Sequence, residues 1–535
     1  MEQGVRVMGR RRGRWVVWLL VFVLVAAACG GDDDDDASGG GGGAESTEGG
    51  GGGNTPRLVV GTDAEPTTLD IQAIDDNGLT LSTWSINEGL VDFDPEGNIE
   101  PVLAAELPVI DEEDPTHWHV TLREGIEFSD GTPLDAEAVK FNVERIIDPE
   151  FGSVLAEELG GLSGAEVIDD LNVDLITEGP DPLLINRLRR LRLVSPAAAE
   201  SDTYGENPVG TGPYLFDSWQ RGQSLTLTAN PDYWGEPKPT IDEIEIRFIP
   251  DVNTRMSALA SGEISIAVNP PDSQIEQLQT DESLEILFVE GGESGTTRFN
   301  TATPPYDDVR FRQALNYAID KDTMVEQLFN GLYPVQDCNV APPGVQGHND
   351  ELAAYPYDLD KAKELLAEVD VPDGFAIEFV GSSAVYGSDR EIQETMASYW
   401  RDIGLEVNTQ FPEIDAYLDA IYNPDLPIVY AESDHALNSL IRQIGTFLER
   451  GGPVTALSEE DQAGMDPLVE TVKSTLDADE RDETMQEIAR IACEEAYFVF
   501  TFFRQDVVAL AANIEYESDL GQFEKTDWHR VRVTG

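Results

Sequence analysis

The chain has 535 residues, which at roughly 150 residues per domain predicts about three folded units. Because 41% of the residues are hydrophobic and 26% are charged, most of the chain is expected to fold around buried cores. The 103 acidic residues outnumber the 34 basic ones and leave a formal net charge of −69, which repels phosphate backbones and anionic lipid. This charge disfavours nucleic acid as a partner. It is compatible with a cationic or zwitterionic ligand, or with adaptation to salt.

The N-terminus has the three parts of a secretory signal: a charged segment, an apolar segment and small residues at its end. Five arginines precede an apolar run over residues 15–28, and Ala26, Ala27 and Ala28 stand directly before Cys29. The 14 apolar residues would span about 21 Å of helix, too short to cross the ~30 Å core of a bilayer permanently. The alanines and Cys29 resemble a bacterial lipobox, in which the cysteine is acylated. We therefore expect a signal peptide over 1–28 and lipidation of Cys29, with ordinary secretion as the alternative.

Residues 29–56 lack the apolar side chains that would offset the entropy cost of ordering them. They contain an unbroken acidic run from Asp32 to Asp36 and two glycine runs, Gly39–Gly43 and Gly49–Gly53. Such a segment is expected to be a disordered tether that reaches very roughly 25–30 Å. With an acylated Cys29 it would hold a folded body at the extracellular face of the cell membrane, in the equivalent of a periplasmic space.

The two remaining cysteines, Cys338 and Cys493, are even in number in a chain that is expected to be exported. Export makes a disulfide chemically permissible, because compartments outside the cytosol are oxidising. A bridge between Cys338 and Cys493 is one interpretation, and two buried free thiols are the other.

From residue 57 onward, strands and helices are predicted to alternate. The predicted strands cover 58–61, 117–122 and 241–249, and the predicted helical stripes cover 138–147, 311–319 and 362–369. Asp307-Asp308 and Asp358 stand where they can cap the second and third of these helices. This order is typical of layered α/β domains, and no internal repeat of fixed period indicates a solenoid.

Ten short motifs follow one another over roughly residues 57–510. The first, LVVGTDAEPTTLD, covers 58–70, and the longest runs from Trp118 to Leu134. The others cover 88–90, 101–104, 208–214, 230–234, 261–266, 308–320, 357–366 and 403–405. In sequence and order they resemble the bacterial extracellular solute-binding proteins of family 5, the peptide and nickel group. Any one motif is weak, but the ordered set is highly specific.

The resemblance implies an α/β fold of the periplasmic-binding-protein type, a two-lobed clamshell of class II with an extra subdomain inserted in the first lobe. By motif order, the first lobe comprises 57–96, 208–297 and a C-terminal return over 505–535. The insertion comprises 97–207 and the second lobe 298–504. Ligand lies between the lobes in such proteins, and closure around hinge strands signals its presence to a membrane permease.

The resemblance also implies candidate ligand residues. In peptide-binding relatives the stretch after the opening motif lies alongside the ligand backbone, which places Asp75, Asp76 and Asn77 there. An aspartate in a Trp-x-x-Asp-like segment of the second lobe pairs with the α-amino group of the peptide, and Asp434 is its counterpart here. A carboxylate buried opposite an ammonium confers specificity, because other ligands leave it unpaired.

Two observations bear on ligand class. The sequence that normally follows the aspartate is replaced by His435–Asn438, so a ligand without an amine, with Asp434 as an ordinary exposed acid, stays open as an alternative. Tyr386, at a predicted strand end after Gly381-Ser382-Ser383, could present an aromatic face with a polar tip to varied ligand groups. Core packing is the alternative for Tyr386.

Most of the motifs are expected to serve structure. Gly210–Tyr214 has the glycines and proline of a tight turn, and it lacks the third glycine and following helix that a dinucleotide fingerprint needs. Trp234, Arg312 and Asp320 are expected to serve packing and polar pairing.

No catalytic arrangement is predicted, so the chain is not expected to be an enzyme. His117 and His119 share one face of a strand and could in principle chelate a metal, but spacing supplies no third ligand. There is no Gly-x-Ser-x-Gly nucleophile elbow. We predict no metal and no cofactor.

The expected function is that of a lipid-anchored substrate-binding protein of an ABC importer, a monomer that captures peptides or similar small solutes. The permease and ATPase subunits would be separate chains, and the lipid anchor would supply the membrane contact. One alternative is a binder of a nickel chelate, an opine or an oligosaccharide on the same scaffold. Another is a ligand sensor for a membrane signalling receptor.

Overall fold

The computed structural model describes residues 57–534 except 75, 95–96, 112, 383–387, 434–438 and 517–527. The predicted signal peptide, Cys29 and the tether lie outside the described residues, as do Asp75, Tyr386 and Asp434. No helix within the described ranges is long and apolar enough to cross a membrane.

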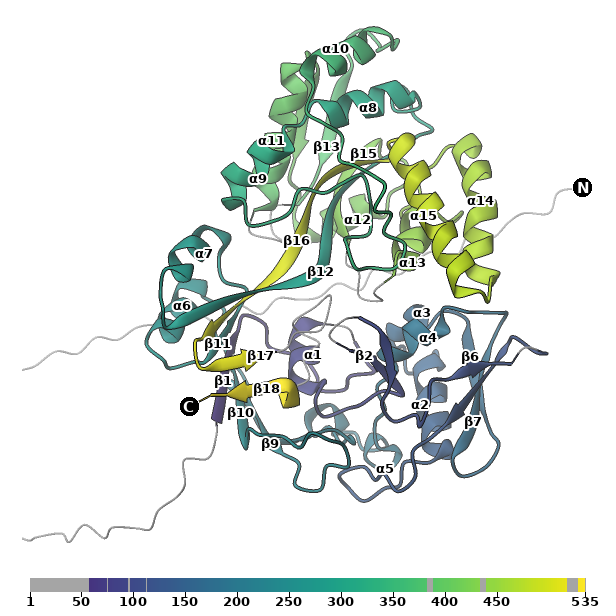
Figure 1. Ribbon diagram of the computed structural model, residues 1–535, viewed down its shortest axis with the longest axis vertical. Coiled ribbons are helices and arrows are strands. Elements are labelled where there is room, and N and C mark those ends of the chain that lie inside the picture. Colours follow the sequence, from purple (N-terminus) through teal and green to yellow (C-terminus); the bar gives the residue numbers. More distant parts are fainter. Residues whose placement is uncertain are drawn as a thin grey trace, which may run out of the picture. The chain divides into compact units, whose positions relative to one another are not determined.

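Ten of the described strands form one mixed sheet (Figure 1). They are β1 (Arg57–Thr62), β8 (Tyr214–Gln220), β9 (Ser224–Ala229), β10 (Glu243–Phe248), β11 (Ile266–Val268), β12 (Leu284–Phe299), β13 (Ala376–Val380), β14 (Glu406–Gln410), β15 (Ile428–Ser433) and β16 (Phe498–Ala511). Their order across the sheet is β14-β13-β15-β12-β16-β11-β1-β10-β9-β8. The predicted strand at 58–61 is confirmed as β1, an interior strand parallel to both β10 and β11. Its unbroken apolar run fits burial on both faces.

The long antiparallel strands β12 and β16 belong to both halves of this sheet. One end of the pair continues through β11 to β8, and the other end continues through β15 to β14 (Figure 1). Their pairing is regular up to Val289 opposite Asp506 and resumes, after a register shift, with Glu293 opposite Arg504. A register shift of this kind bends a strand and increases its twist, so the two halves can face different directions without losing continuity.

The described helices lie between these strands. They are α1 (Asn77–Thr83), α2 (Ala136–Ile147), α3 (Leu155–Glu158), α4 (Leu184–Arg187), α5 (Pro196–Ala199), α6 (Val252–Ala260), α7 (Asp272–Gln279), α8 (Val309–Tyr317), α9 (Lys321–Phe329), α10 (Leu359–Ala367), α11 (Asp389–Asp402), α12 (Ile414–Ile421), α13 (Ile441–Gln443), α14 (Glu459–Ser474) and α15 (Ala478–Glu494). The predicted caps are confirmed, because Asp308 accepts a hydrogen bond from Arg310 N at 2.9 Å and Asp358 accepts one from Lys361 N at 2.8 Å.

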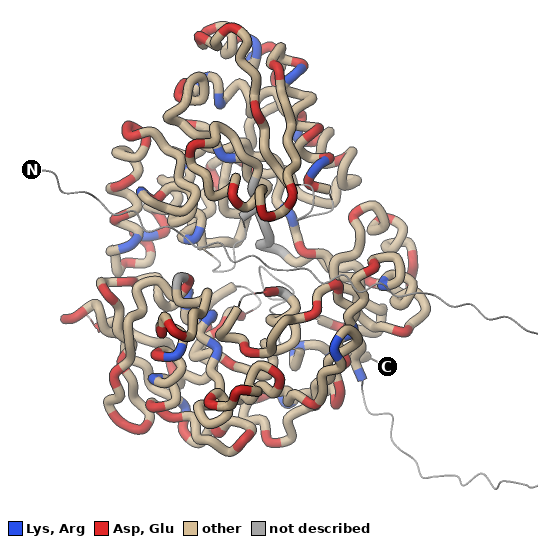
Figure 2. Tube along the Cα trace, turned by 180° about the vertical axis from the view of Figure 1, so that it is seen from behind, with Lys and Arg blue, Asp and Glu red and all other residues tan. Residues whose placement is uncertain are grey.

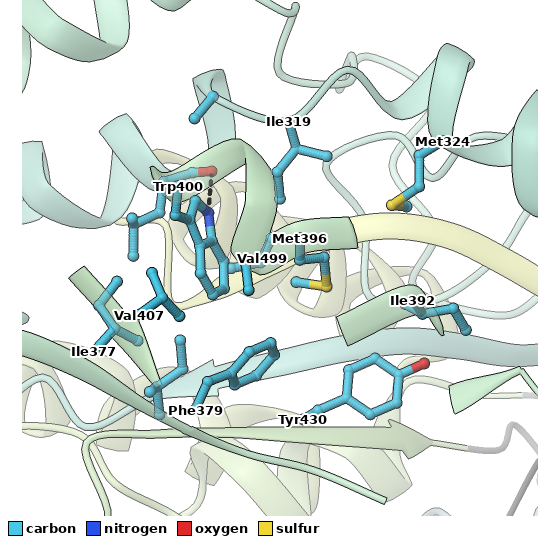
Figure 3. Packing of buried hydrophobic residues seen from close by; sticks show 14 of the residues in the cluster. Ile319, Met324, Ile377, Phe379, Ile392, Met396, Trp400, Val407, Tyr430 and Val499 are labelled. Atoms are coloured by element: carbon cyan, nitrogen blue, oxygen red, sulfur yellow. Dashed lines mark hydrogen bonds between the residues drawn. The ribbon is translucent and has the colours of Figure 1, made fainter. Parts of the chain in front are cut away.

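Helices α8 to α11 pack against β13, β15 and β16 around one large apolar core (Figure 3). On α11, Ile392, Met396 and Trp400 are spaced by four residues and form the buried stripe of an amphipathic helix. Trp400 is completely buried and donates its indole N–H to the carbonyl of Leu315 at 3.0 Å, which joins α11 to α8. The polar atom of this large side chain is thereby satisfied inside the core.

A second core lies under a separate antiparallel sheet of order β4-β5-β7-β6. The strands are β4 (Val109–Ile110), β5 (His117–Thr121), β6 (Leu162–Val167) and β7 (Asn172–Thr177). Trp118 and Val120 of β5 pack with Val139 and Val143 of α2, as the predicted alternation and helical stripe require. We call this cluster the α2 core. Two small sheets pair β2 (Val91–Phe93) with β3 (Ile99–Pro101) and β17 (Ile514–Tyr516) with β18 (Val531–Val533).

A third core contains a disulfide. Cys338 and Cys493 are bridged, with their Cα atoms 5.3 Å apart, so the structure has the first of the two arrangements that the sequence allowed. Cys338 packs with Val340 and Ala341 and with apolar residues of α13, α14 and α15. We call this cluster the disulfide core. The bridge spans 155 residues of sequence, which on the chain-entropy model stabilises the fold by about 4–5 kcal/mol before strain is subtracted.

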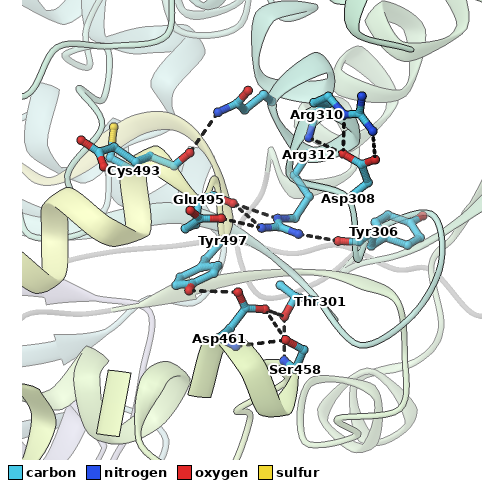
Figure 4. Close-up of polar contacts among 12 residues, drawn as sticks. Thr301, Tyr306, Asp308, Arg310, Arg312, Ser458, Asp461, Cys493, Glu495 and Tyr497 are labelled. Atoms are coloured by element: carbon cyan, nitrogen blue, oxygen red, sulfur yellow. Dashed lines mark hydrogen bonds and ion pairs between the residues drawn. The ribbon is translucent and has the colours of Figure 1, made fainter. Parts of the chain in front are cut away.

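Acidic residues are distributed over the whole described trace, whereas basic residues are few (Figure 2). Several arginines are buried, where they bind backbone carbonyls. Arg312, for example, donates to the carbonyls of Tyr306 at 2.7 Å and Glu495 at 2.6 Å, and so ties α8 to the end of α15 (Figure 4). Arg298 likewise donates to carbonyls of the 421–426 loop, and its burial lowers the pKa of the guanidinium to about 10. These buried arginines therefore connect separate segments of the chain through hydrogen bonds to backbone carbonyls.

Lys321 differs from these arginines. Its side chain at the start of α9 is buried, and among the described residues its ammonium has no hydrogen-bond partner. Burial lowers the pKa of Lys321 from 10.5 to about 7, although Asp322 and Asp337 favour the charged form. Below pH 7 the lysine is protonated in both the folded and the unfolded chain, so folding carries the full cost of burying a charge. That cost declines as the pH rises from 7 toward 10.5.

Lys321→Met is therefore expected to raise the free energy of unfolding at pH 6 by about 2 kcal/mol or more. The gain should shrink steadily when urea unfolding is repeated at pH 8 and pH 9.5, because the wild-type lysine is then increasingly neutral. Lys363→Met, on the exposed face of α10, is the matched control and should change little at any pH. An equal gain for Lys321→Met at pH 6 and pH 9.5 would contradict this assignment.

Candidate ligand-binding site

The candidate site begins at one edge of the sheet. Strand β13 pairs in parallel with β14 and with β15, and Val380 at its end stands opposite Gln410 and Val429. The carboxyl ends of parallel strands meet at the same edge, and ligands of open α/β sheets bind beyond that edge. In the sequence, Tyr386 comes shortly after the end of β13, and Asp434 comes directly after the end of β15. Tyr386 and Asp434 themselves lie outside the described residues.

The exit of β13 is fixed by α11. Gln393 of α11 is completely buried and donates from its amide to the carbonyls of Ser382 at 3.2 Å and Asp389 at 2.9 Å. Its side chain fills the space in front of Gly381, where an added Cβ would lie 1.2 Å from the amide oxygen of Gln393. A side chain at 381 would therefore displace the Gln393 amide. The hydrogen bond from this amide to Ser382 fixes the backbone where the chain leaves β13.

The end of β15 lies level with the register shift in β12 and β16. Ser433 of β15 pairs with Ser294 of β12, next to the pairing of Glu293 with Arg504 of β16. The Arg504 guanidinium lies 3.9 Å from the Asp272 carboxylate of α7 and 3.4 Å from the hydroxyl of Ser388, which precedes α11. Tyr333 donates its hydroxyl to the same Asp272 at 2.7 Å. Burial and Asp272 raise the pKa of Tyr333, so its hydroxyl stays protonated and keeps donating.

The other predicted ligand segment stands at the start of α1. Asp76 is the N-cap of this helix and accepts a hydrogen bond from Leu79 N at 2.6 Å. Asn77 is the first residue of α1, and its side chain is outside the described set, as is Asp75. The cap fixes the direction in which α1 leaves the 75–77 segment, because it satisfies a backbone N–H that the helix cannot.

The motif residues that were expected to be structural meet at one buried carboxylate. Glu88 accepts hydrogen bonds from Thr211 Oγ1 at 2.7 Å, from Tyr233 at 2.8 Å and from the indole of Trp234 at 2.8 Å. A Cβ on Gly210 would lie 2.0 Å from a backbone carbonyl of the 85–86 segment, so the glycine permits a close approach of two backbones. Arg312 and Asp320 also have the predicted structural roles, and Asp320 caps α9 through Thr323 N at 3.1 Å.

Histidines give no metal site within the described residues. No group of three or more potential metal-ligating side chains occurs there. His119 bonds Asp174 across β5 and β7 with a 2.7 Å contact, and this hydrogen bond raises the pKa of the imidazole. His117 lies 3.4 Å from Asp114. Each histidine thus contacts an aspartate, His119 across two strands and His117 in the turn before β5.

A scan against family models matches residues 98–434 to the bacterial extracellular solute-binding proteins, family 5. The chain belongs to this family. The family resemblance stated from the motifs is therefore confirmed, and with it the mixed α/β, two-lobed fold.

Three relatives show the range of this similarity. The glutathione-binding protein GsiB of Escherichia coli O1:K1 is 33% identical over 323 residues, which cover 60% of this chain and 62% of that protein. NikA from Brucella suis, solved in complex with Fe(III)-EDTA, matches 90% of this chain and 100% of its own with a TM-score of 0.79 at 21% identity. AgaA from A. tumefaciens R10, solved with agropinic acid, matches 90% and 99% with a TM-score of 0.72 at 25% identity. The chain thus spans about 62% of the length of the curated relative, and these family relatives are binding proteins.

Reasoning from sequence missed the polar group around Arg504. Its signal was present, because Arg504 follows the largely apolar run 498–503 within β16, and an arginine inside a buried strand needs polar partners. The partners, Asp272 and Tyr333, are far away in the chain, and no local pattern indicates them. The capping role of Asp76 was missed too, although an aspartate three residues before an apolar helix position is a typical N-cap.

Proposed function

We propose that this family 5 protein is the lipid-anchored substrate-binding component of an ABC importer. It would capture a small solute between its two lobes and deliver it to permease and ATPase subunits on separate chains. The observation that carries the proposal is the continuity of the sheet through β12 and β16, with a register shift beside Ser433, the last residue of β15. A two-strand joint of this kind can bend while the cores on either side stay packed.

The lobes follow from this joint. The first lobe would comprise 57–96, 208–297 and 505–535, with the insertion over 97–207, and the second lobe would comprise 298–504. The α2 core would fall mainly in the insertion and the disulfide core mainly in the second lobe, so each part would have its own apolar interior. Arg504 and Asp272 lie on opposite sides of the joint, and their contact would adjust as the lobes open and close.

The ligand site would be built from both lobes. Asp434 and Tyr386 would face the ligand from the carboxyl edge of β15 and β13, and Asp75, Asp76 and Asn77 would face it from the start of α1. Asp434 would pair with a ligand ammonium, which favours a peptide or a similar amine-bearing solute. Asp76 would hold the start of α1 beside the ligand through its cap of Leu79 N.

A second ligand class is supported by a specific observation. The sequence after Asp434 departs from that of peptide binders at His435–Asn438, and AgaA, at 25% identity, was solved with agropinic acid. An opine, a metal chelate or another non-peptide solute on the same scaffold is therefore the alternative. The two classes differ in whether binding depends on a free amine.

Asp434→Asn distinguishes them. If Asp434 pairs with an ammonium, the substitution keeps shape and polarity but should weaken binding of glutathione or trialanine at least about 30-fold in calorimetry. N-acetylated trialanine should bind wild type weakly and should be little affected by the substitution, since both changes delete the same interaction. Asp425→Asn, which removes an exposed carboxylate before β15, should bind as wild type does. Equal affinities of wild type and Asp434→Asn for both peptides would refute the role of Asp434.

The anchor has its own test. Acylation of Cys29 should partition the protein into membranes, because each buried methylene contributes about 0.8 kcal/mol. Cys29→Ser should move the protein to the soluble fraction of a bacterial host or leave the signal uncleaved, as judged by fractionation and intact mass. A Cys29→Ser protein that remains in the membrane fraction with the wild-type N-terminus would show that the anchor is not this cysteine.

A further inference from the structure

Two adjacent leucines, Leu183 and Leu184, are buried in different cores. Both side chains are completely buried. Leu184 begins α4 and packs in the α2 core with Trp118 and Val139. Leu183 belongs instead to the disulfide core, together with Cys338 and residues of the 340–345 segment. Leu183 immediately precedes α4 and Leu184 is its first residue, so the turn before α4 lies where the two cores adjoin.

The turn that presents Leu183 is held from within. The carboxylate of Asp181 accepts a hydrogen bond from Leu183 N at 3.2 Å and forms an ion pair with Arg187 at the end of α4. The carbonyl of Asp181 accepts a further hydrogen bond from Leu184 N at 3.1 Å. Gly160 leaves room for the Arg187 side chain, because an added Cβ would meet its guanidinium. The turn is therefore already ordered around Leu183, so that burial of this side chain costs little conformational entropy.

The 338–345 segment of the disulfide core is also held in place by bonds to other parts of the chain. The bridge from Cys338 to Cys493 ties the start of the 338–345 segment to α15. Along the segment, Gln336 donates to the carbonyl of Asn339 at 2.8 Å, and His348 bonds the carbonyl of Ala341 at 2.8 Å. These contacts satisfy the backbone around an apolar surface formed by Val340 and Val345. Leu183 is thus buried in a core whose backbone is held by a disulfide and by hydrogen bonds.

We propose that burial of Leu183 in the disulfide core holds the inserted subdomain against the second lobe and so sets the ratio of closed to open molecules. We call this contact the catch. This inference rests on the proposed function only in its use of the two lobes, because Leu183 belongs to the insertion and the rest of the disulfide core belongs to the second lobe. Opening would move Leu183 from an apolar core into water, which disfavours the open state. The catch lies outside the predicted ligand segments. It therefore sets solute affinity through the fraction of closed molecules, and this effect is independent of the chemical class of the solute.

The test measures lobe separation without any solute. Single-molecule energy transfer would be recorded on the full-length, detergent-solubilised protein with dyes on Leu107→Cys and Tyr357→Cys, two exposed positions in the insertion and the second lobe. Leu183→Ala should raise the ratio of open to closed molecules by about 10- to 30-fold, and Leu183→Asp should raise it further. Leu184→Ala, the same change one residue away, should lower the thermal midpoint but leave the energy-transfer distribution unchanged.

The outcomes separate the two claims. A Leu183→Asp protein with the wild-type distribution would overturn the catch, whatever solute the protein binds. A shifted distribution in Leu184→Ala as large as in Leu183→Ala would overturn it as well, because the effect would then come from loss of packing in the α2 core. Neither result would bear on whether Asp434 contacts the solute, which calorimetry with Asp434→Asn measures independently.

Discussion

The antiparallel pairing of β12 with β16 is the constraint on which the rest of the structure depends. These two strands carry hydrogen bonds to β11 on one side of the register shift and to β15 on the other, so one sheet supports both lobes. Ser433, the last residue of β15, pairs with Ser294 of β12 beside this irregular register. Because β16 is long, largely apolar and buried along most of its length, the proposed hinge would be restricted to the few residues at the irregular register.

Acidic residues are spread along this chain, whereas some of its few basic residues are buried and hydrogen-bonded. Acidic residues occur along all parts of the described trace, whereas Arg298 and Arg312 are buried and bonded to carbonyls (Figure 2). Arginine suits this role because its guanidinium offers five donors and stays charged. A buried carboxylate is held in the same way. Burial would raise the pKa of Asp92, but Arg192 and Arg189 lower it below its ordinary value. Lys321 is the contrasting case, a buried cation without such partners among the described residues.

Much of the fold could be predicted from the sequence because its signals are local. The N-caps Asp308 and Asp358, the alternation around Trp118 and the order of the motifs need no knowledge of distant contacts. The pairing of β1 with β10, whose residues are nearly two hundred positions apart, left no local trace. The division of Leu183 and Leu184 between two cores likewise depends on the tertiary arrangement, which two identical side chains in sequence do not encode.

The candidate site was harder to predict from the sequence, for a different reason. Asp434 and Asp75 are aspartates in a chain with 103 acidic residues, so their type carries little information. Their prediction came from the family resemblance alone. Gly381 and Gln393, which fix the path out of β13, became visible only through the steric fit between them. The Asp272–Tyr333–Arg504 group joins three distant parts of the chain, and only the fold brings it together.

The central claim is that the protein holds a small solute and does not transform it. The direct measurement is native mass spectrometry of the full-length protein purified from cells grown in rich medium, followed by analysis of the molecules released on denaturation. The account predicts one solute per chain, exchangeable for added solute and recovered chemically unchanged after prolonged incubation. A released molecule that is converted into product during incubation with the protein, or a chain that never carries or takes up a solute, would contradict it.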